Sequence, residues 1–284
     1  MDKNLLTGIK AFYFDLDGTT FVNEKEIDSS TLRVFETLKQ KGFKVGIATG
    51  RHHLEIQEQL EKIKPNLPVI TVNGTMMLDP QSKKVLNINN FNIDEGEEIL
   101  KIIEKNNVLS CSFTNEEIIY SYNEDLNEDL KVFEQEYEIS LKTQYPIPYV
   151  FLDKNEKRKN LKINKFLLFG KNLDEKKYKN IKKDIETSGI DAQILYAYNN
   201  FIEIFPRKTS KASSLALVAK NINWSLDSFG FFGDGVNDIE ICKAAKLCVA
   251  MGNSWKELKS VATVETKTNL ENGIEFFFKK IELL

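Results

Sequence analysis

The stretch AFYFDLDGTTF, residues 11–21, decides the fold. Its apolar first half has the composition of a short buried β-strand, and the strand ends in two aspartates that are one residue apart. On an extended chain Asp15 and Asp17 point the same way, so their negative charges repel each other unless a third group offsets them. The function therefore depends on which other segments end beside this one.

Two further apolar runs also end in polar residues. Residues 43–48 are followed by Thr49-Gly50-Arg51, and residues 229–232 are followed by GDGVND at 233–238. Ligands of open α/β sheets bind beyond the carboxyl ends of parallel strands. We therefore expect the three strand ends to meet at one edge of a sheet.

The beginning of the chain alternates between strands and helices. Apolar periodicity predicts strands at 12–16, 43–48 and 69–72, with helices around residues 32–38 and 56–63. This β-α-β-α-β order predicts a parallel sheet covered by helices on both faces.

The pattern changes after about residue 80 and returns near residue 190. Hairpins mixed with helices in between predict a small α+β unit on an antiparallel sheet, with turns at 79–81 and 115–117, strands at 150–152 and 164–169, and helices around 99–103, 126–137 and 178–185. A hairpin at 194–205 with a turn at 199–200 follows, and then helices at 211–222, 239–245 and 274–281 around strands at 229–232 and 247–250. The expected fold is α/β, with a doubly wound, mostly parallel, Rossmann-like core made of residues 1–82 and 191–284 and an inserted α+β domain at 83–190.

The composition excludes several classes of protein. The 284 residues carry a net charge of −3, from 39 basic and 42 acidic side chains, which shows no bias towards nucleic acid or anionic membranes. No apolar stretch predicts a signal peptide or a membrane span. The three cysteines form no C-x-x-C pair, so we expect unpaired thiols and a cytoplasmic location. The sequence leaves the oligomeric state open.

Four carboxylates fall on two of the three predicted strand ends. Asp234 and Asp238 join Asp15 and Asp17, and such crowding requires a cation or retained protons. Hard oxygen ligands favour Mg²⁺ over zinc, and the only histidines, His52 and His53, lie together at a predicted helix start. Taken alone, D-x-D-G-T also fits an acidic turn or the metal-holding D-x-D of a nucleotide-sugar enzyme.

The motifs together resemble those of the haloacid dehalogenase-like (HAD) phosphatase superfamily, in particular its Cof-like branch. The matching segments are FDLDGT at 14–19, IATGR at 47–51, ITVNG at 70–74, Lys211, and GDGVND at 233–238. Ala212 and Ile241 stand where the family often has Gly and Met, and neither position carries chemistry. Lys208 competes with Lys211 for the lysine role, but Lys211 directly precedes a predicted helix, as the family pattern implies.

The resemblance implies that the inserted α+β domain is a cap domain. It also implies a role for each of these residues. Asp15 would be the nucleophile and a Mg²⁺ ligand. Asp17 would be the acid–base residue, whose main-chain carbonyl also binds Mg²⁺. Asp234 would be the further metal ligand, with Asp238 helping directly or through water. The phosphate would be held by the amides of Leu16 and Gly50 and by the side chains of Thr49, Lys211 and Asn237. Thr49 and Lys211 would also belong to the catalytic residues, and Lys211 would offset the negative charge of the nucleophile and the phosphate.

Simpler interpretations stay open for several of these residues. Thr49 could cap the following helix, Lys211 could be a solvated lysine, and Asn73 could only shape a turn. The basic stretch 154–165 is expected to be a solvated loop, with attraction of an anionic substrate as the alternative.

The resemblance implies a Mg²⁺-dependent phosphatase that hydrolyses small phosphorylated metabolites, such as sugar phosphates or phosphorylated cofactors, through an aspartyl-phosphate. One alternative is a phosphomutase of the phosphomannomutase type, which the scarcity of arginine disfavours. Another alternative is a binding or regulatory protein on the same fold, which the complete set of motif residues disfavours.

Overall fold

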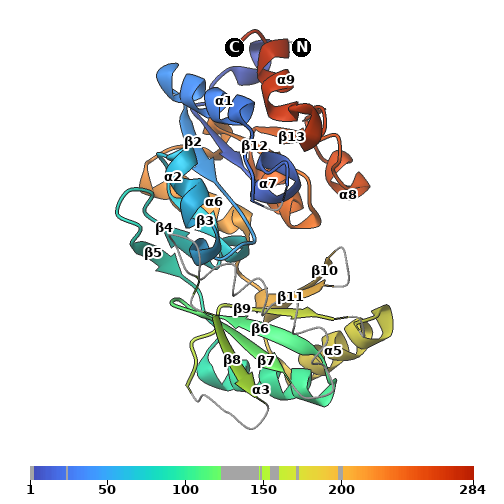
Figure 1. Cartoon of the computed structure of the whole chain (residues 1–284). Helices are drawn as coiled ribbons and strands as arrows, with labels where there is room; N and C mark the ends of the chain where they lie inside the picture. Colours follow the sequence, from blue (N-terminus) through green and yellow to red (C-terminus); the bar gives the residue numbers. More distant parts are fainter. Residues whose placement is uncertain are drawn as a thin grey trace. The chain divides into compact units, whose positions relative to one another are not determined.

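The computed structural model describes residues 3–23, 25–122, 147, 149–153, 160–170, 173–197 and 201–284 (Figure 1). The chain forms two compact units, each with its own sheet and helices. The first unit is made of residues 1–87 and 209–284, and the second is made of residues 88–208. The second unit is therefore inserted into the first, between two halves that share one sheet.

The first unit is built on a parallel five-stranded sheet with strand order β14-β13-β12-β1-β2. The strands are β1 (Ala11–Phe14), β2 (Lys44–Ile47), β12 (Phe229–Gly233), β13 (Leu247–Ala250) and β14 (Val264–Glu265). β1 lies at the centre, with Phe14 in register with Ile47 on one side and Phe232 on the other. All four β1 side chains are buried, as expected for a parallel strand with both faces covered.

Helices cover both faces of this sheet. Phe12 and Phe14 pack among the rings of Phe35, Phe232 and Phe278, on the side of α1 (Ser29–Gln40) and α9 (Gly273–Lys280). The alternate residues Ala11 and Tyr13 join the apolar cluster of α6 (Lys211–Asn221) and α7 (Ile239–Ala244). The expected doubly wound α/β core is confirmed.

A small three-stranded sheet, of order β3-β4-β5, follows α2 (Gln57–Ile63). β3 (Val69–Thr71) pairs antiparallel with β4 (Met76–Leu78), and β5 (Val85–Ile88) completes the hairpin expected around residues 79–81. β3 was expected to be a full member of the parallel sheet, but it meets that sheet only through a parallel bridge between Ala48 and Ile70. The chain turns back at Val72 and Asn73, where φ is positive, and β3 pairs with β4 through this turn.

The second unit has a six-stranded mixed sheet of order β10-β11-β9-β6-β7-β8. Its elements are α3 (Ile93–Lys105), β6 (Leu109–Phe113), β7 (Ile118–Tyr122), β8 (Tyr149–Asp153), β9 (Lys165–Phe169), α5 (Glu175–Ser188), β10 (Ala192–Ala197) and β11 (Phe201–Pro206). The α3 and α5 side chains Ile99, Ile103 and Ile181 pack in one apolar cluster with Phe166 and Leu168 of β9. This is the α+β unit that the hairpins predicted, although β7 and β8 pair in parallel.

The boundary of the inserted unit differs from the expected one. The sequence pattern places residues 191–208 in the core, whereas β10 pairs with β11 and β11 pairs antiparallel with β9 in the inserted sheet. Hairpin periodicity identifies two strands but not the sheet that they join, and here Ile204 lies opposite Phe166. The predicted helix at 126–137 and the predicted turn at 199–200 lie outside the described residues.

The basic stretch 154–165 falls only partly within the described residues, and its last residue differs from the expectation. Lys165 was expected to be solvated, but it is 2% exposed and forms an ion pair with Glu203. Its ammonium also lies 5.2 Å from the centre of the Phe113 ring. Lys165 is therefore part of the packing of the inserted unit.

The remaining described elements are short. They are α8 (Lys256–Lys259), the single-turn 3₁₀ segments Lys3–Leu6, His53–Glu55, Val72–Gly74, Leu226–Ser228, Val236–Asp238 and Asn269–Glu271, and the irregular turn Leu16–Thr20. None of the helices in the described part of the chain has the length and apolar character that a membrane crossing requires.

Two of the three cysteines form a disulfide, so the expectation of unpaired thiols is wrong for them. Cys242 of α7 is bonded to Cys248 of β13, with their Cα atoms 5.0 Å apart. Cys111, a buried thiol of β6, lies outside this bond. The spacing of six residues carries no familiar motif, and only the return of the chain from α7 into β13 brings the sulfurs together.

The disulfide predicts a simple thiol count. Alkylation of the denatured, unreduced protein should modify Cys111 alone, whereas all three cysteines should react after reduction. Reduction should also lower the free energy of unfolding by about 2 kcal/mol, because the bond closes a short loop. A Cys111→Ser variant is the control and should respond to reduction as the wild type does. Modification of all three cysteines without reductant, measured by mass spectrometry, would contradict the pairing.

Candidate active site

The three predicted strand ends meet at the carboxyl edge of the parallel sheet. The amide of Asp15 donates to the Phe232 carbonyl at 2.9 Å, and the amide of Ala48 donates to the Phe14 carbonyl at 3.0 Å. One carboxylate oxygen from each of Asp15, Asp234 and Asp238 lies within 4.8 Å of the others. Acids more than 200 residues apart in the chain thus share one small volume.

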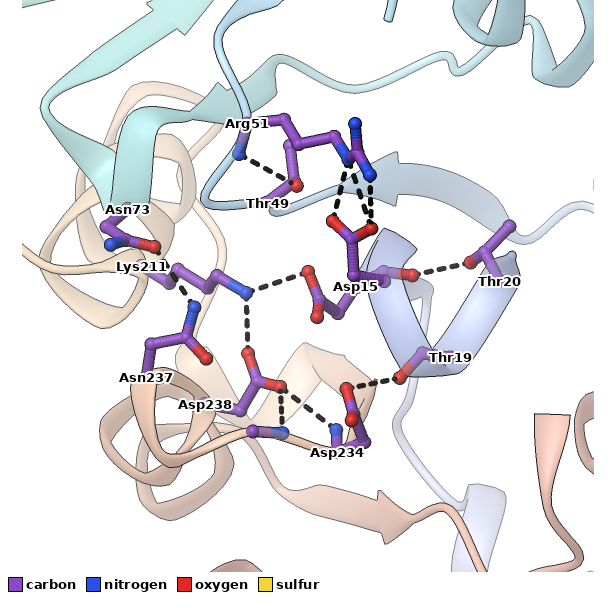
Figure 2. Close-up of polar contacts among 12 residues, drawn as sticks. Asp15, Thr19, Thr20, Thr49, Arg51, Asn73, Lys211, Asp234, Asn237 and Asp238 are labelled. Carbon is purple, nitrogen blue, oxygen red and sulfur yellow. Dashed lines mark hydrogen bonds and ion pairs between the residues drawn. The ribbon is translucent and has the colours of Figure 1, made fainter. Parts of the chain in front are cut away.

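Lys211 lies in the middle of this cluster (Figure 2). Its Nζ donates to Asp15 Oδ1 at 2.8 Å and to Asp238 Oδ1 at 2.7 Å, and all three side chains are buried. Lys211 begins α6, whose first turn is capped by the Ser210 side chain. Lys208, the competing lysine of the sequence analysis, is exposed. Burial lowers the pKa of the Lys211 ammonium, but the two carboxylates Asp15 and Asp238 outweigh it, so this pKa is raised above its ordinary value.

Asp238 uses both of its carboxylate oxygens within the protein. Oδ1 accepts from Lys211, while Oδ2 accepts from the main-chain amides of Asp234 and Gly235 at 3.0 and 3.1 Å. By contrast, Asp15 and Asp234 each keep one carboxylate oxygen that accepts no hydrogen bond from the described part of the chain. These two are the carboxylates best placed to hold a cation, with Asp238 supporting the loop behind them.

The charges of the cluster do not balance. One lysine faces three carboxylates, so the group is anionic when every acid is ionised. Burial, opposed by Lys211 and reinforced by the neighbouring carboxylates Asp238, Asp234 and Asp17, raises the pKa of Asp15 well above its usual range. Burial and the Asp238 charge raise the pKa of Asp234 to about 7. A hard divalent cation suits this donor set, because it offsets the excess charge with the oxygen ligands that Mg²⁺ prefers.

The Asp17 carboxylate is expected among the crowded acids, but the buried cluster is formed by Asp15, Asp234 and Asp238 without it. The Asp17 side chain is 52% exposed and forms an ion pair with Arg51, whose Nη2 lies 2.7 Å from Asp17 Oδ1. The next residue, Gly18, has φ of +68°, and a Cβ there would lie 2.2 Å from Asp234 Oδ2. Only glycine therefore allows the turn after β1 to approach Asp234 so closely.

The predicted phosphate-binding residues lie around the same edge. Thr49 is buried, and its hydroxyl accepts from the Arg51 amide at 3.2 Å. The cap of the following 3₁₀ turn is His52, so the alternative role of Thr49 as a helix cap does not apply. Leu16 directly follows Asp15, and Gly50 lies close to Asn237, whose Nδ2 would be 3.6 Å from a Cβ built at Gly50.

Asn73 has a larger part in the site than the sequence indicated. Its Oδ1 accepts from Asn237 Nδ2 at 3.1 Å, and its main-chain amide donates to the Thr49 carbonyl at 3.0 Å. Asn73 therefore ties the second motif to the GDGVND loop, as Figure 2 shows for the two amide side chains. The signal in the sequence was Asn-Gly directly after a strand, which by itself predicts no more than a turn.

The turn that carries Asn73 is strained. Val72 has φ of +50°, which is rare for a β-branched residue, and Asn73 follows with φ of +55°. Gly74, with φ of +94°, packs against the start of α6, and its carbonyl accepts from the Ser214 hydroxyl at 2.8 Å. Such strain persists only where surrounding contacts impose it. Here it joins Asn73 to the helix that begins with Lys211.

Gly74 can be tested against a second glycine of positive φ. A Cβ at Gly74 would lie 2.2 Å from the Ser210 carbonyl oxygen, whereas a Cβ at Gly42, where φ is +88°, would meet no atom within 4 Å. Gly42→Ala should cost about 1–2 kcal/mol of stability from its backbone conformation alone. Gly74→Ala should cost about 1–3 kcal/mol more and should displace Lys211. Equal losses in urea unfolding of the two variants would contradict the packing argument.

The raised pKa of Asp234 predicts that the stability of the protein depends on pH. Because the folded pKa of Asp234 is about 7, against an ordinary value of 3.8, the metal-free protein loses stability as the pH rises through this interval. Without metal at pH 8, Asp234→Asn should therefore exceed the wild type in free energy of unfolding by on the order of 1–3 kcal/mol, and it should unfold at a higher temperature. This gain should shrink at pH 5.

The same pair of proteins tests cation binding by thermal unfolding. MgCl₂ should stabilise the wild type and leave Asp234→Asn unchanged, since a ligand stabilises only the state that binds it. Asp227→Asn, an exposed carboxylate of the same unit, is the matched control and should follow the wild type. Identical responses of Asp234→Asn and the wild type to pH and to MgCl₂ would refute this account of the cluster.

Comparison with known families supports the family resemblance that the motifs carry. A family model described as haloacid dehalogenase-like hydrolase matches residues 12–278. The phosphatase YwpJ of Bacillus subtilis is 25% identical over 96% of this chain and 100% of its own length. The pyridoxal phosphate phosphatase YbhA of Escherichia coli is 21% identical over 93% of this chain and 95% of its own length.

Solved structures support the fold. The HAD subclass IIB sugar phosphatase BT4131 superposes with a TM-score of 0.77 at 23% identity, covering 97% of this chain and 100% of its own. The likeness spans the inserted unit as well as the core. The resemblance to the Cof-like branch, stated from the motifs, is therefore confirmed.

Proposed function

The chain belongs to the haloacid dehalogenase-like hydrolase family, and we propose that it uses Asp15, Mg²⁺ and an aspartyl-phosphate intermediate to hydrolyse small phosphate monoesters. Its class as a phosphoric monoester hydrolase follows from the family and from relatives that are named phosphatases. The proposal concerns the mechanism, the metal and the substrates.

One observation carries the mechanism. Asp15 is a buried carboxylate with one oxygen held by Lys211 at 2.8 Å and the other free of hydrogen bonds from the described residues. Lys211 thus fixes the carboxylate and leaves one oxygen available for attack on phosphorus. A positioned carboxylate nucleophile beside a buried cation suits phosphoryl transfer, which depends mainly on positioning and electrostatics.

The steps follow from the residues around Asp15. The available oxygen of Asp15 attacks the phosphorus atom, and the bond from phosphorus to the ester oxygen breaks. Asp17 gives a proton to the departing oxygen and later takes one from the water that attacks the aspartyl-phosphate. Thr49, Asn237 and the amides of Leu16 and Gly50 hold the phosphoryl oxygens, while Lys211 offsets their charge.

Mg²⁺ fits the donor set of the site. Asp15, Asp234 and the main-chain carbonyl of Asp17 would hold it, and Asp238 would support the loop that carries Asp234. When bound, the ion offsets negative charge on the phosphoryl group.

The proposed substrates are small phosphorylated metabolites. The support comes from two relatives, one named a pyridoxal phosphate phosphatase and the other a sugar phosphatase. The net charge of −3 does not favour a nucleic-acid substrate. A panel of phosphorylated sugars and cofactors, ranked by kcat/KM, would choose among them.

Asp15→Asn tests the nucleophile. The variant should release phosphate from p-nitrophenyl phosphate at least about 10³-fold more slowly than the wild type, because an amide is a poor nucleophile for phosphorus. Acid quenching during turnover should trap a phosphoryl group on Asp15 of the wild type, measured by peptide mass spectrometry. The exposed Asp227→Asn is the control and should keep full activity. Phosphate release by Asp15→Asn at the wild-type rate would refute the mechanism.

A further inference from the structure

We propose that Arg51 is a positioning residue that fixes the carboxylate of Asp17, and that it thereby controls how well the enzyme expels leaving groups that need a proton. The inference rests on the proposed function, since it takes Asp17 as the acid–base residue. It goes further because it assigns a role to an arginine that neither the metal cluster nor the phosphate-binding set requires.

Arg51 holds Asp17 with a two-point contact. Its Nε donates to Asp17 Oδ2 at 2.8 Å and to Oδ1 at 3.1 Å, and its Nη2 donates to Oδ1 at 2.7 Å. Dashed lines from Arg51 in Figure 2 mark these bonds. Within the described residues, Arg51 supplies every hydrogen bond that this carboxylate accepts. Because the Asp17 side chain is 52% exposed, no tight packing replaces the contact.

Arg51 is itself held in place. Its main-chain amide donates to the Thr49 hydroxyl at 3.2 Å, and its carbonyl accepts from the Val72 amide at 3.0 Å. Its guanidinium lies 5.6 Å from the centre of the ring of Phe21, a buried residue whose amide donates to the Leu16 carbonyl at 2.8 Å. The strained turn and the loop after β1 thus orient the Arg51 guanidinium. The guanidinium in turn orients the carboxylate of Asp17.

The contact has the geometry that distinguishes arginine from lysine. A planar fork that bonds both carboxylate oxygens fixes the orientation of the acid, whereas an ammonium acts as a point charge. Arg51→Lys therefore keeps the charge and loses the orientation. General acid catalysis requires a proton donor within hydrogen-bonding reach of the departing oxygen, so the loss should appear mainly when the leaving group is a poor one.

Two aryl phosphates of similar shape make the test. p-Nitrophenyl phosphate releases a stable phenolate that needs little protonation, whereas phenyl phosphate releases a more basic one. The variants are Arg51→Lys, Arg51→Gln, Asp17→Asn and the double variant Asp17→Asn/Arg51→Lys. Arg33→Lys is the matched control, since Arg33 is an exposed arginine of α1 whose Nη1 donates to Ser29 Oγ at 3.1 Å. The quantity compared is kcat/KM in MgCl₂, with kcat and KM resolved.

Arg51→Lys should lower kcat/KM for phenyl phosphate by about 10-fold or more and for p-nitrophenyl phosphate by no more than about threefold, mainly through kcat. Arg51→Gln should follow the same direction. In the Asp17→Asn background Arg51→Lys should have no further effect, because the arginine acts through that carboxylate. Arg33→Lys should match the wild type on both substrates.

Equal losses on both substrates, a rise in KM alone, or additive effects in the double variant would overturn the role of Arg51. Each of these outcomes leaves the proposed function standing if Asp15→Asn is inactive on both esters. If Asp15→Asn keeps its activity, the proposed function fails first, and the inference about Arg51 fails with it.

Discussion

The buried bridge from Lys211 to Asp15 and Asp238 is the interaction on which the rest of the site depends. Two buried carboxylates held by one ammonium are stable only while all three stay together, because an unpaired buried charge is costly. The bridge joins the end of β1, the start of α6 and the loop after β12. It also leaves Asp234 without a compensating charge of its own, which is why the cluster suits a divalent cation.

The close approach of these loops requires particular backbone conformations. Gly18 lets the turn after β1 lie against Asp234, and Gly74 lets the strained turn after β3 lie against the start of α6. The buried Asp15 and the half-exposed Asp17 have different ion-pair partners. Lys211 holds Asp15 from inside the core, whereas Arg51 holds Asp17 from the solvent side.

Much of the core could be predicted from the sequence, because short apolar runs that end in Asp15, Thr49 and Asp234 have one natural arrangement in a parallel sheet. The contacts of Asn73 and Arg51 could not be predicted. They depend on which loops face each other across the sheet edge, and neither residue differs in type from an ordinary turn or surface residue. The same limit applies to residues 191–208 and to the Cys242–Cys248 bond, since local periodicity does not specify which strand or helix is the partner.

The central claim is that Asp15 and Asp234 form one cation site beside a phosphoryl-accepting oxygen. The most direct measurement is a crystal structure of the protein grown with Mn²⁺ in place of Mg²⁺, with the ion located by its anomalous scattering. We expect one peak in contact with carboxylate oxygens of both Asp15 and Asp234 while Lys211 stays on Asp15. A map with no peak between these two carboxylates at millimolar Mn²⁺, or with the ion on other residues, would contradict it.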